Sequence, residues 1–226
     1  MSIIEKPSKK RIGVLISGTG SNMKVLAQAC QIDEYPAEVC LVVSDKRDVK
    51  GLETAREMGI NAVAFPRKDY ASKTDHEAAI LAALDEADVD FICLAGYMRI
   101  LSGEFIKKWS GKLINIHPSL LPLFPGLHTH DRAIAAGCKV HGCTVHFVTE
   151  GMDEGPIIAQ AVVPIVPNDT ADSLAGRVLK TEHILYQRAL KQLASEQVRM
   201  TQDEKTEFLE IKASDAQSNE NDYLIS

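Results

Sequence analysis

The chain has 226 residues, of which 45% are hydrophobic and 25% charged, a composition typical of a soluble globular protein with one substantial core. A formal net charge of −6 argues against nucleic acid as a partner. Apolar runs such as residues 91–95 are too short to span a bilayer, and residues 1–10 lack the apolar segment of a signal peptide, so we expect a cytoplasmic protein without membrane contact.

The first half of the chain alternates short apolar runs with stretches of helical periodicity. Strands are predicted at residues 11–17, 38–44, 61–65, 91–95 and 113–117. Helices are predicted at residues 23–32, 51–58, 74–87 and 102–109. This alternation indicates an α/β fold with a doubly wound, mostly parallel sheet and a Rossmann-like N-terminal half. Such sheets bind ligands at the carboxyl ends of their strands, where residues 18–22, 96–99 and His117 are expected to gather.

The pattern changes after Pro118. A proline-rich loop at residues 119–126 precedes a short helix at 129–136, and residues 140–149 and 157–164 predict an antiparallel strand pair near the C-terminal part. A long amphipathic helix is predicted at residues 170–193, with its N-cap at Asp169 or Thr170. We therefore divide the chain into an N-terminal extension (1–10), one folded domain (11–195) and a polar tail (196–226) that we expect to be flexible.

A glycine-containing turn joins the first predicted strand to the first predicted helix. Backbone N–H groups of Gly20, Ser21 and Asn22, at the positive end of that helix, can hold one phosphate. Met23 stands where a dinucleotide-binding fingerprint needs its third glycine, and the Lys-Ser/Thr pair of a Walker loop is missing. The turn is therefore either a site for a single phosphate or a tight connection without a ligand.

Asn115 and His117 lie two residues apart at the end of the 113–117 strand, so they project from the same face of the sheet. An amide beside an imidazole can stabilise a developing oxyanion, and a nearby carboxylate such as Asp153 favours the charged imidazole. This arrangement points to acyl-group chemistry at the end of the sheet. The alternative interpretation is a polar pair that caps the following loop.

The five cysteines are scattered and lie mostly inside apolar runs, which indicates reduced core thiols. Cys138 and Cys143 lie near His141 and His146, a combination that invites a zinc interpretation. The strand-like alternation of these residues and the lack of a second ligand pair argue against a zinc site, and no metal is expected.

Six motifs occur in order between residues 11 and 193. They are Ser17-Gly-Thr-Gly-Ser-Asn22, Ala95-Gly-Tyr-Met-Arg-Ile-Leu101, Asn115-Ile-His-Pro-Ser-Leu-Leu-Pro122, Pro125-Gly-Leu-His-Thr-His130, His141-Gly-Cys-Thr-Val-His-Phe-Val148 and Met152-Asp-Glu-Gly-Pro156. Together they resemble the phosphoribosylglycinamide formyltransferase family, folate-dependent enzymes of purine synthesis. The third motif is shared among enzymes that use formyltetrahydrofolate, whereas the first and fourth point to the glycinamide ribonucleotide enzyme.

The resemblance implies that residues 11–195 form a formyltransferase catalytic domain. Its reaction would pass a formyl group from 10-formyltetrahydrofolate, the co-substrate, to the amine of glycinamide ribonucleotide in de novo purine biosynthesis. Asn115 and His117 would stabilise the tetrahedral oxyanion. Asp153 would favour the charged imidazole and help to position a water that relays a proton. No metal is required.

The resemblance also implies the binding residues. Gly20, Ser21 and Asn22 would hold the phosphate of the ribonucleotide, and Glu182 would contact its glycinamide end or its ribose. Folate contacts are implied at Lys73, Met98, Arg99, Ile100, Leu101, Asn115, Thr149, Glu150, Gly151, Met152 and Asp153. Lys73 stands where the family commonly has an arginine, and this leaves its contact open because lysine lacks the bidentate fork of arginine.

Three other functions are weighed against this one. A 10-formyltetrahydrofolate hydrolase would use the same residues with water as the acceptor, but is expected to carry a regulatory domain ahead of the catalytic one. A methionyl-tRNA formyltransferase is expected to carry a C-terminal RNA-binding domain and a basic surface. A nucleotide-binding sensor, which is no transferase, would place Asp45 on a ribose. Small molecules are the expected partners, and the expected state is a monomer or homodimer.

Overall fold

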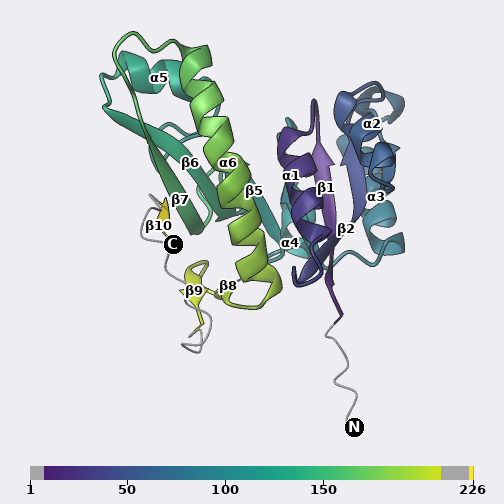
Figure 1. Cartoon of the computed structure of the whole chain (residues 1–226). Helices are drawn as coiled ribbons and strands as arrows, with labels where there is room; N and C mark the ends of the chain where they lie inside the picture. Colours follow the sequence, from purple (N-terminus) through teal and green to yellow (C-terminus); the bar gives the residue numbers. More distant parts are fainter. Residues whose placement is uncertain (1–7, 210–223, 226) are drawn as a thin grey trace.

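The computed structural model describes residues 8–209 and 224–225, and its main feature is an eight-stranded sheet in the order β10-β7-β6-β5-β4-β1-β2-β3 (Figure 1). The strands are β1 (Lys10–Ile16), β2 (Ala37–Ser44), β3 (Asn61–Ala64), β4 (Phe91–Leu94), β5 (Leu113–His117), β6 (Val140–Phe147), β7 (Ile157–Pro164) and β10 (Leu224–Ile225). The pairs that join β3, β2, β1, β4 and β5 are parallel. The predicted doubly wound, mostly parallel sheet is confirmed.

The predicted antiparallel strand pair, β6 and β7, continues the main sheet. β6 pairs antiparallel with β5 on one side and with β7 on the other. In the β5–β6 pair, Asn115 lies opposite His146 and His117 lies opposite Thr144. Side chains from residues about 30 apart in sequence therefore meet at one end of the sheet.

Helices connect the strands within a residue or two of the predicted positions. They are α1 (Ser21–Cys30), α2 (Lys50–Glu57), α3 (Lys73–Glu86), α4 (Gly103–Lys108), α5 (Thr129–Ala135) and α6 (Ala171–Ala194), with a short 3-10 turn, η1 (Arg67–Asp69). Hydrogen bonds to capping side chains fix the first residues of several of these helices. Ser72 accepts the backbone N–H of Asp75 at 3.0 Å, and Thr170, one of the two predicted caps of α6, accepts that of Ser173 at 3.2 Å.

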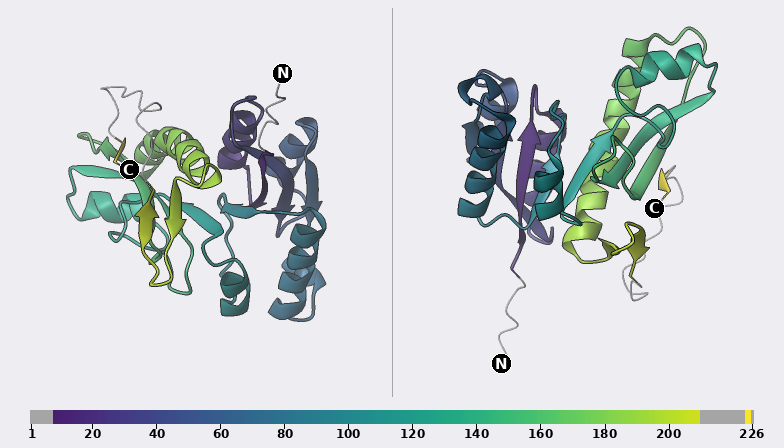
Figure 2. Two further views of the ribbon diagram at one scale, coloured as in Figure 1. Left: turned by 90° about the horizontal axis from the view of Figure 1, so that it is seen from below. Right: turned by 180° about the vertical axis from the view of Figure 1, so that it is seen from behind.

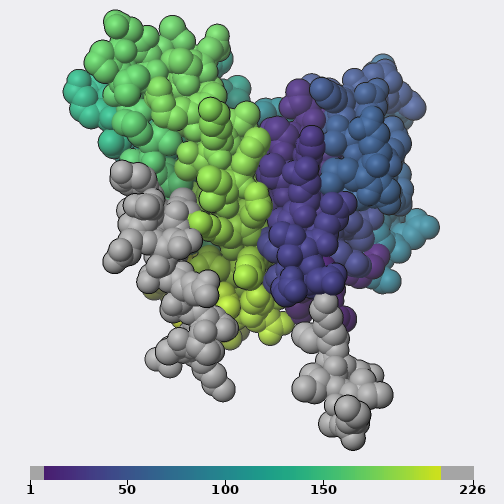
Figure 3. Space-filling model, viewed as in Figure 1, coloured from purple at the N-terminus to yellow at the C-terminus, as the bar shows by residue number. Residues whose placement is uncertain are grey.

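Alternate residues of the central strand face two separate hydrophobic cores, as expected for a sheet covered on both sides. Ile12, Val14 and Ile16 of β1 lie in the core under α1, α2 and α6, whereas Leu15 lies in the core under α3 and α4. Figure 2 shows these helices on opposite sides of the sheet. In the space-filling view, a notch separates the region around the start of α6 from α1 and α2, on the side to which β1 points (Figure 3).

Residues that follow α6 form a β-hairpin, so the expected flexible tail is wrong for this stretch. Strands β8 (Val198–Met200) and β9 (Thr206–Phe208) pair antiparallel, and Val198 is buried in the core under α6. The hydroxyl of Thr206 donates to the Ile157 carbonyl at 2.7 Å, which ties the hairpin to β7. The polar composition that suggested flexibility reflects the exposed faces of two short strands. The rest of the predicted tail, except β10, and residues 1–7 of the extension lie outside the described residues.

Within the described ranges, no helix is long and apolar enough to cross a membrane. All five cysteines are free, and burial raises the pKa of the Cys30 thiol to about 12, as expected for an unreactive core thiol. The same part of the chain holds no group of three His, Cys, Asp or Glu side chains arranged to bind a metal ion. That the reaction needs no metal stays a prediction.

Candidate active site

The carboxyl end of β5 carries a chain of polar side chains that includes the three predicted catalytic residues. Asp153 Oδ2 lies 3.4 Å from His117 Nδ1, and Asp153 Oδ1 lies 3.9 Å from His146 Nε2. The side-chain amide of Asn115 lies 3.3 Å from the same His146 nitrogen. The structure therefore brings Asn115, His117 and Asp153 to one place and adds His146, which the sequence analysis had considered only as a zinc ligand.

His117 is held as a hydrogen-bond donor. Its Nε2 lies 3.2 Å from the carbonyl oxygen of Phe124, and this nitrogen must carry a hydrogen because a carbonyl oxygen can only accept. Its Nδ1 faces the Asp153 carboxylate. Both ring nitrogens thus point at oxygen acceptors, and a substrate oxygen that took the place of the Phe124 carbonyl would receive the Nε2 hydrogen bond.

Asp153 lies in the loop that joins β6 to β7, in the left-handed region of backbone space with φ 55°. This conformation is uncommon for residues other than glycine, although Asp tolerates it better than most. The backbone N–H of Gly126 donates to Asp153 Oδ2 at 2.8 Å, so the loop after β5 is tied to the loop after β6. The carboxylate therefore receives support from two loops and faces two histidines.

His146 is a neutral hydrogen-bond acceptor in this cluster. Its Nδ1 lies 2.8 Å from the carbonyl oxygen of Phe147 and so must donate, and burial lowers the pKa of the ring, which favours the uncharged form. Nε2 then accepts from the Asn115 amide and fixes its orientation. The signal that could have found His146 is its place opposite Asn115 on the neighbouring strand. That pairing depends on strand register, which the sequence alone did not give.

Two further histidines lie behind His117. The rings of His130 and His141 are 5.2 Å apart in an edge-to-face arrangement, and the Nε2 atom of each is buried with no hydrogen-bond partner in the described part of the chain. Burial lowers the pKa of both rings, and that of His141 falls to about 4. Both histidines are therefore neutral at physiological pH.

The predicted phosphate turn lies at the start of α1. Gly20 has φ 72°, and a Cβ atom there would lie 2.8 Å from the Cα of Gly51, so only glycine fits this approach. The backbone N–H groups of Ser21 and Asn22 open the helix. The Asn22 side chain turns inward and donates to Glu182 Oε2 at 2.7 Å. Burial raises the pKa of Glu182, and the hydrogen bond from Asn22 opposes the rise. Two of the residues assigned to the ribonucleotide are thus in contact through their side chains.

Four predicted folate residues form the segment between β4 and α4. Met98 and Ile100 are 66% and 72% exposed, which is unusual for apolar side chains of this size, whereas Leu101 is buried in the core under α3 and α4. The guanidinium of Arg99 pairs with Asp45, with 2.7 Å between Nε and Oδ2. Only 1% of the Asp45 side chain is exposed. This burial counts against the alternative in which Asp45 contacts a ribose.

Lys73, the first residue of α3, lies near the far end of that segment. Its Nζ is 3.8 Å from Glu77, which also accepts hydrogen bonds from the backbone N–H of Ser102 at 2.9 Å and from the Ser102 hydroxyl. The lysine therefore stands beside a carboxylate that anchors the start of α4. Through Glu77, Lys73 is linked to Ser102, which directly follows the predicted folate residues 98–101.

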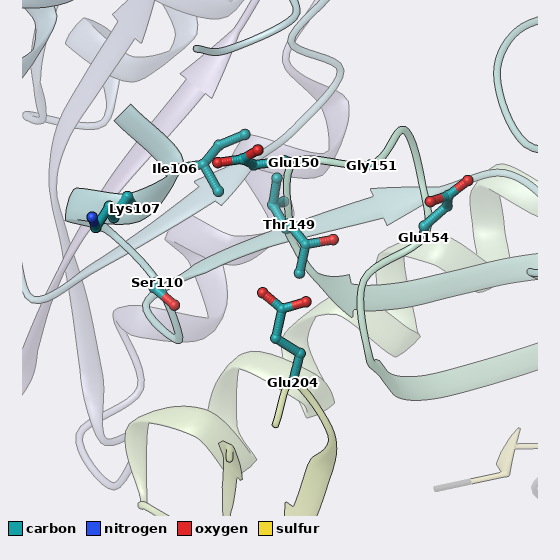
Figure 4. Close-up of a pocket in the computed structure, with 9 residues that line it drawn as sticks. Ile106, Lys107, Ser110, Thr149, Glu150, Gly151, Glu154 and Glu204 are labelled. Carbon is teal, nitrogen blue, oxygen red and sulfur yellow. The ribbon is translucent and has the colours of Figure 1, made fainter. Parts of the chain in front are cut away.

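The loop after β6 carries the remaining predicted folate residues. Thr149, Glu150 and Gly151 line a cavity of about 420 Å³ together with α4 and the hairpin turn (Figure 4). The carboxylates of Glu150, Glu154 and Glu204 border this cavity, with Lys107 of α4 at its edge. Asn115, His117 and Asp153 do not line it. The acidic cavity and the polar cluster at the end of β5 are therefore lined by different residues of this part of the molecule.

Comparisons with known proteins identify the family. A family model described as formyl transferase matches residues 10–190. Over 191 residues the chain is 41% identical to the phosphoribosylglycinamide formyltransferase of Haemophilus influenzae, which covers 84% of this chain and 90% of that protein. The chain belongs to the phosphoribosylglycinamide formyltransferase family. A solved structure of a phosphoribosylglycinamide formyltransferase, from Brucella melitensis, has a TM-score of 0.81 at 58% identity and covers 83% of this chain and 97% of that one.

Similarity also extends to a much longer protein. The chain is 50% identical over 189 residues to the trifunctional purine biosynthetic protein adenosine-3 of Drosophila melanogaster. This match covers 83% of the present chain but 14% of the Drosophila protein. The likeness is therefore confined to one part of that protein, and this chain spans only a small share of its length.

Proposed function

We propose that this chain transfers the formyl group of 10-formyltetrahydrofolate to the amine of glycinamide ribonucleotide, a step of de novo purine biosynthesis. The observation that carries the proposal is the Asp153 carboxylate between His117 and His146, with the Asn115 amide bonded to the same cluster. Family membership supports the reaction type. The names of the bacterial relatives support the ribonucleotide as acceptor.

The chemistry follows from the arrangement of donors. The amine attacks the formyl carbon, and the carbonyl oxygen becomes an oxyanion that the Asn115 amide and His117 Nε2–H stabilise. The carbon–nitrogen bond to N10 of the folate then breaks, as N10 takes up the proton that the amine gives off. Asp153 faces the opposite nitrogen of His117, and in this proposal it keeps that ring a donor and positions the water that relays the proton.

The two substrates are assigned to two sides of this cluster. The backbone amides of Gly20, Ser21 and Asn22 at the start of α1 would hold the phosphate, since a helix N-terminus favours anions. Glu182, beside Asn22, would contact the glycinamide end or the ribose. The folate would lie along the remaining predicted residues, which are Lys73, Met98, Arg99, Ile100, Leu101, Asn115, Thr149, Glu150, Gly151, Met152 and Asp153.

The compartment, the partners, the oligomeric state and the metal requirement of the enzyme are part of the same proposal. The enzyme would act in the cytoplasm on small molecules alone, as a monomer or homodimer, with no metal. Treatment with a chelator should leave the rate of formyl transfer unchanged. Strong inhibition by the chelator would contradict the metal-free scheme.

The direct test is product formation. Purified protein is incubated with 10-formyltetrahydrofolate and glycinamide ribonucleotide, and a parallel reaction contains water as the only acceptor. We expect formylglycinamide ribonucleotide and tetrahydrofolate in equal amounts in the first reaction and negligible deformylation in the second. Equal loss of formyl folate in both reactions would favour the hydrolase, and formylation of methionyl-tRNA alone would favour the tRNA enzyme.

A further inference from the structure

Asp45 is a buried carboxylate to which the proposed reaction assigns no role. It follows the carboxyl end of β2, its side chain is almost completely buried, and its Oδ2 accepts a hydrogen bond from Arg99 Nε at 2.7 Å. Its Oδ1 is buried with no hydrogen-bond partner among the described residues. Burying a carboxylate lowers the stability of the folded protein, and a pairing that leaves one oxygen without a partner offsets this cost only in part. An apolar residue in place of Asp45 would not carry this cost.

Arg99 belongs to the segment between β4 and α4, which three side chains from other elements hold in place. The Ser17 hydroxyl accepts the backbone N–H of Met98 at 2.8 Å, and Glu77 accepts that of Ser102 at 2.9 Å. Those two contacts hold backbone at the two ends of residues 98–102. Asp45 alone holds a side chain in the middle, through a charge-assisted hydrogen bond.

The residues on either side of Arg99 are the two most exposed apolar side chains of this stretch, Met98 and Ile100. Arg99 lies at a bend of the chain between Met98 and Ile100, and its side chain is held by a buried partner. A partner that fixes Arg99 at this bend also restricts the backbone of both neighbours, and with it the directions of their exposed side chains. Exposed apolar side chains held in this way are suited to an aromatic ring system.

We infer that Asp45 is a positioning residue for the folate co-substrate. Through its ion pair with Arg99 it holds residues 98–101 in the conformation that receives the folate, without touching the folate itself. This inference rests on the proposed function, because it assigns Asp45 to the folate side of the same site. It predicts that Asp45 governs folate affinity and leaves the ribonucleotide side and the chemical step unchanged.

The test is a graded pair of substitutions. Asp45→Ala removes the acceptor, and we expect the KM for 10-formyltetrahydrofolate and the Kd for tetrahydrofolate to rise about tenfold, the usual scale for losing a charge-assisted hydrogen bond. Asp45→Asn keeps an acceptor oxygen and should restore most of the affinity, with a rise of about threefold. The value of kcat and the KM for glycinamide ribonucleotide should change by less than about twofold in either variant.

The matched control is Asp69→Asn. Asp69 also pairs with an arginine, Arg47, but this ion pair is exposed, whereas Asp45 is buried. The control should leave both KM values unchanged. Thermal unfolding of each variant separates a folate-specific effect from a general loss of structure, because a poorly folded variant would lose affinity for both substrates.

A double variant shows whether Asp45 acts through Arg99. Arg99→Met removes the guanidinium and keeps the length of the side chain, and adding Asp45→Ala to it should cause no further loss of folate affinity. A further tenfold loss in the double variant, or unchanged folate affinity in Asp45→Ala, would overturn the inference. A different outcome would overturn the proposed function and leave this inference standing. In that outcome the unmodified protein forms no formylglycinamide ribonucleotide, and Asp45→Ala still weakens the binding of tetrahydrofolate.

Discussion

The polar cluster at the end of β5 and the Asn22–Glu182 pair beside α1 are both buried and both hydrogen-bonded, yet they are built differently. In the cluster, Asn115, His117, His146 and Asp153 come from two neighbouring strands and a loop and hold one another. The pair beside α1 is a single contact between a helix start and the middle of α6. A cluster of mutually supported donors and acceptors can stabilise charge during a reaction, whereas a single carboxylate beside backbone amides is suited to binding a substrate. The predictions below test this difference.

The largest effect is expected at the donors of the cluster. Asn115→Ala and His117→Ala should each lower kcat at least about a hundredfold, because each removes a donor from the developing oxyanion. Binding of glycinamide ribonucleotide, measured by calorimetry, should persist in both variants. Asn61→Ala, at an exposed asparagine of β3, serves as the control. Near-normal turnover in either of the first two variants would refute the assignment.

A smaller loss is expected for Asp153→Asn. This variant keeps the shape of the side chain but removes the charge that faces His117 Nδ1 at 3.4 Å. Turnover should fall roughly tenfold or more while the Kd for tetrahydrofolate changes little. The neighbouring Glu154→Gln is the matched control, since Glu154 lines the acidic cavity, which Asp153 does not line. A loss of folate affinity with unchanged kcat would make Asp153 a binding residue.

Glu182→Gln should separate binding from catalysis on the α1 side. The KM for glycinamide ribonucleotide should rise about tenfold, with kcat changed far less.

Because burial raises the pKa of Glu182, the charged carboxylate costs stability, and this cost grows as the pH rises above the ordinary Glu range. The glutamine variant should therefore unfold at the same or a higher temperature than the parent at pH 8. Exposed Glu57→Gln is the control, and a lower unfolding temperature of Glu182→Gln alone would contradict this account.

The smallest effect concerns stability and lies behind the cluster, at His141. Its pKa in the folded protein is lowered to about 4, below the value near 6.5 in an unfolded chain. The neutral ring therefore supports the fold fully above pH 6.5, and this support is lost as the pH falls from 6.5 towards 4. In urea unfolding, His141→Asn should show a weaker pH dependence over that window. His128→Asn, at an exposed position whose backbone suits asparagine, should match the parent.

The predictable parts of this molecule are those with a strong local signal. The strand at 113–117 and the strand at 157–164 were placed at their observed bounds because each is a compact apolar run with clear breaks. The doubly wound, mostly parallel character of the sheet followed from the alternation of strands with helices. The candidate catalytic residues followed from the spacing of Asn115 and His117 on one strand, and Asp153 from its motif.

The parts that sequence reasoning missed depend on contacts between distant residues. His146 enters the cluster because β6 pairs with β5 in one register, and no local pattern specifies that register. Asp45 meets Arg99 because β2 and β4 lie on either side of β1, which the spacing of two charges does not show. The β8–β9 hairpin was missed since its strands are three residues long and little more than Val198 is buried.

The hydrogen bond from Gly126 to Asp153 has one more consequence. It joins the loop after β5 to the turn that carries Asp153, so a movement of either loop would also displace this carboxylate from His117. The alignment of the polar cluster therefore depends on a backbone donor from outside the cluster as well as on its own side chains.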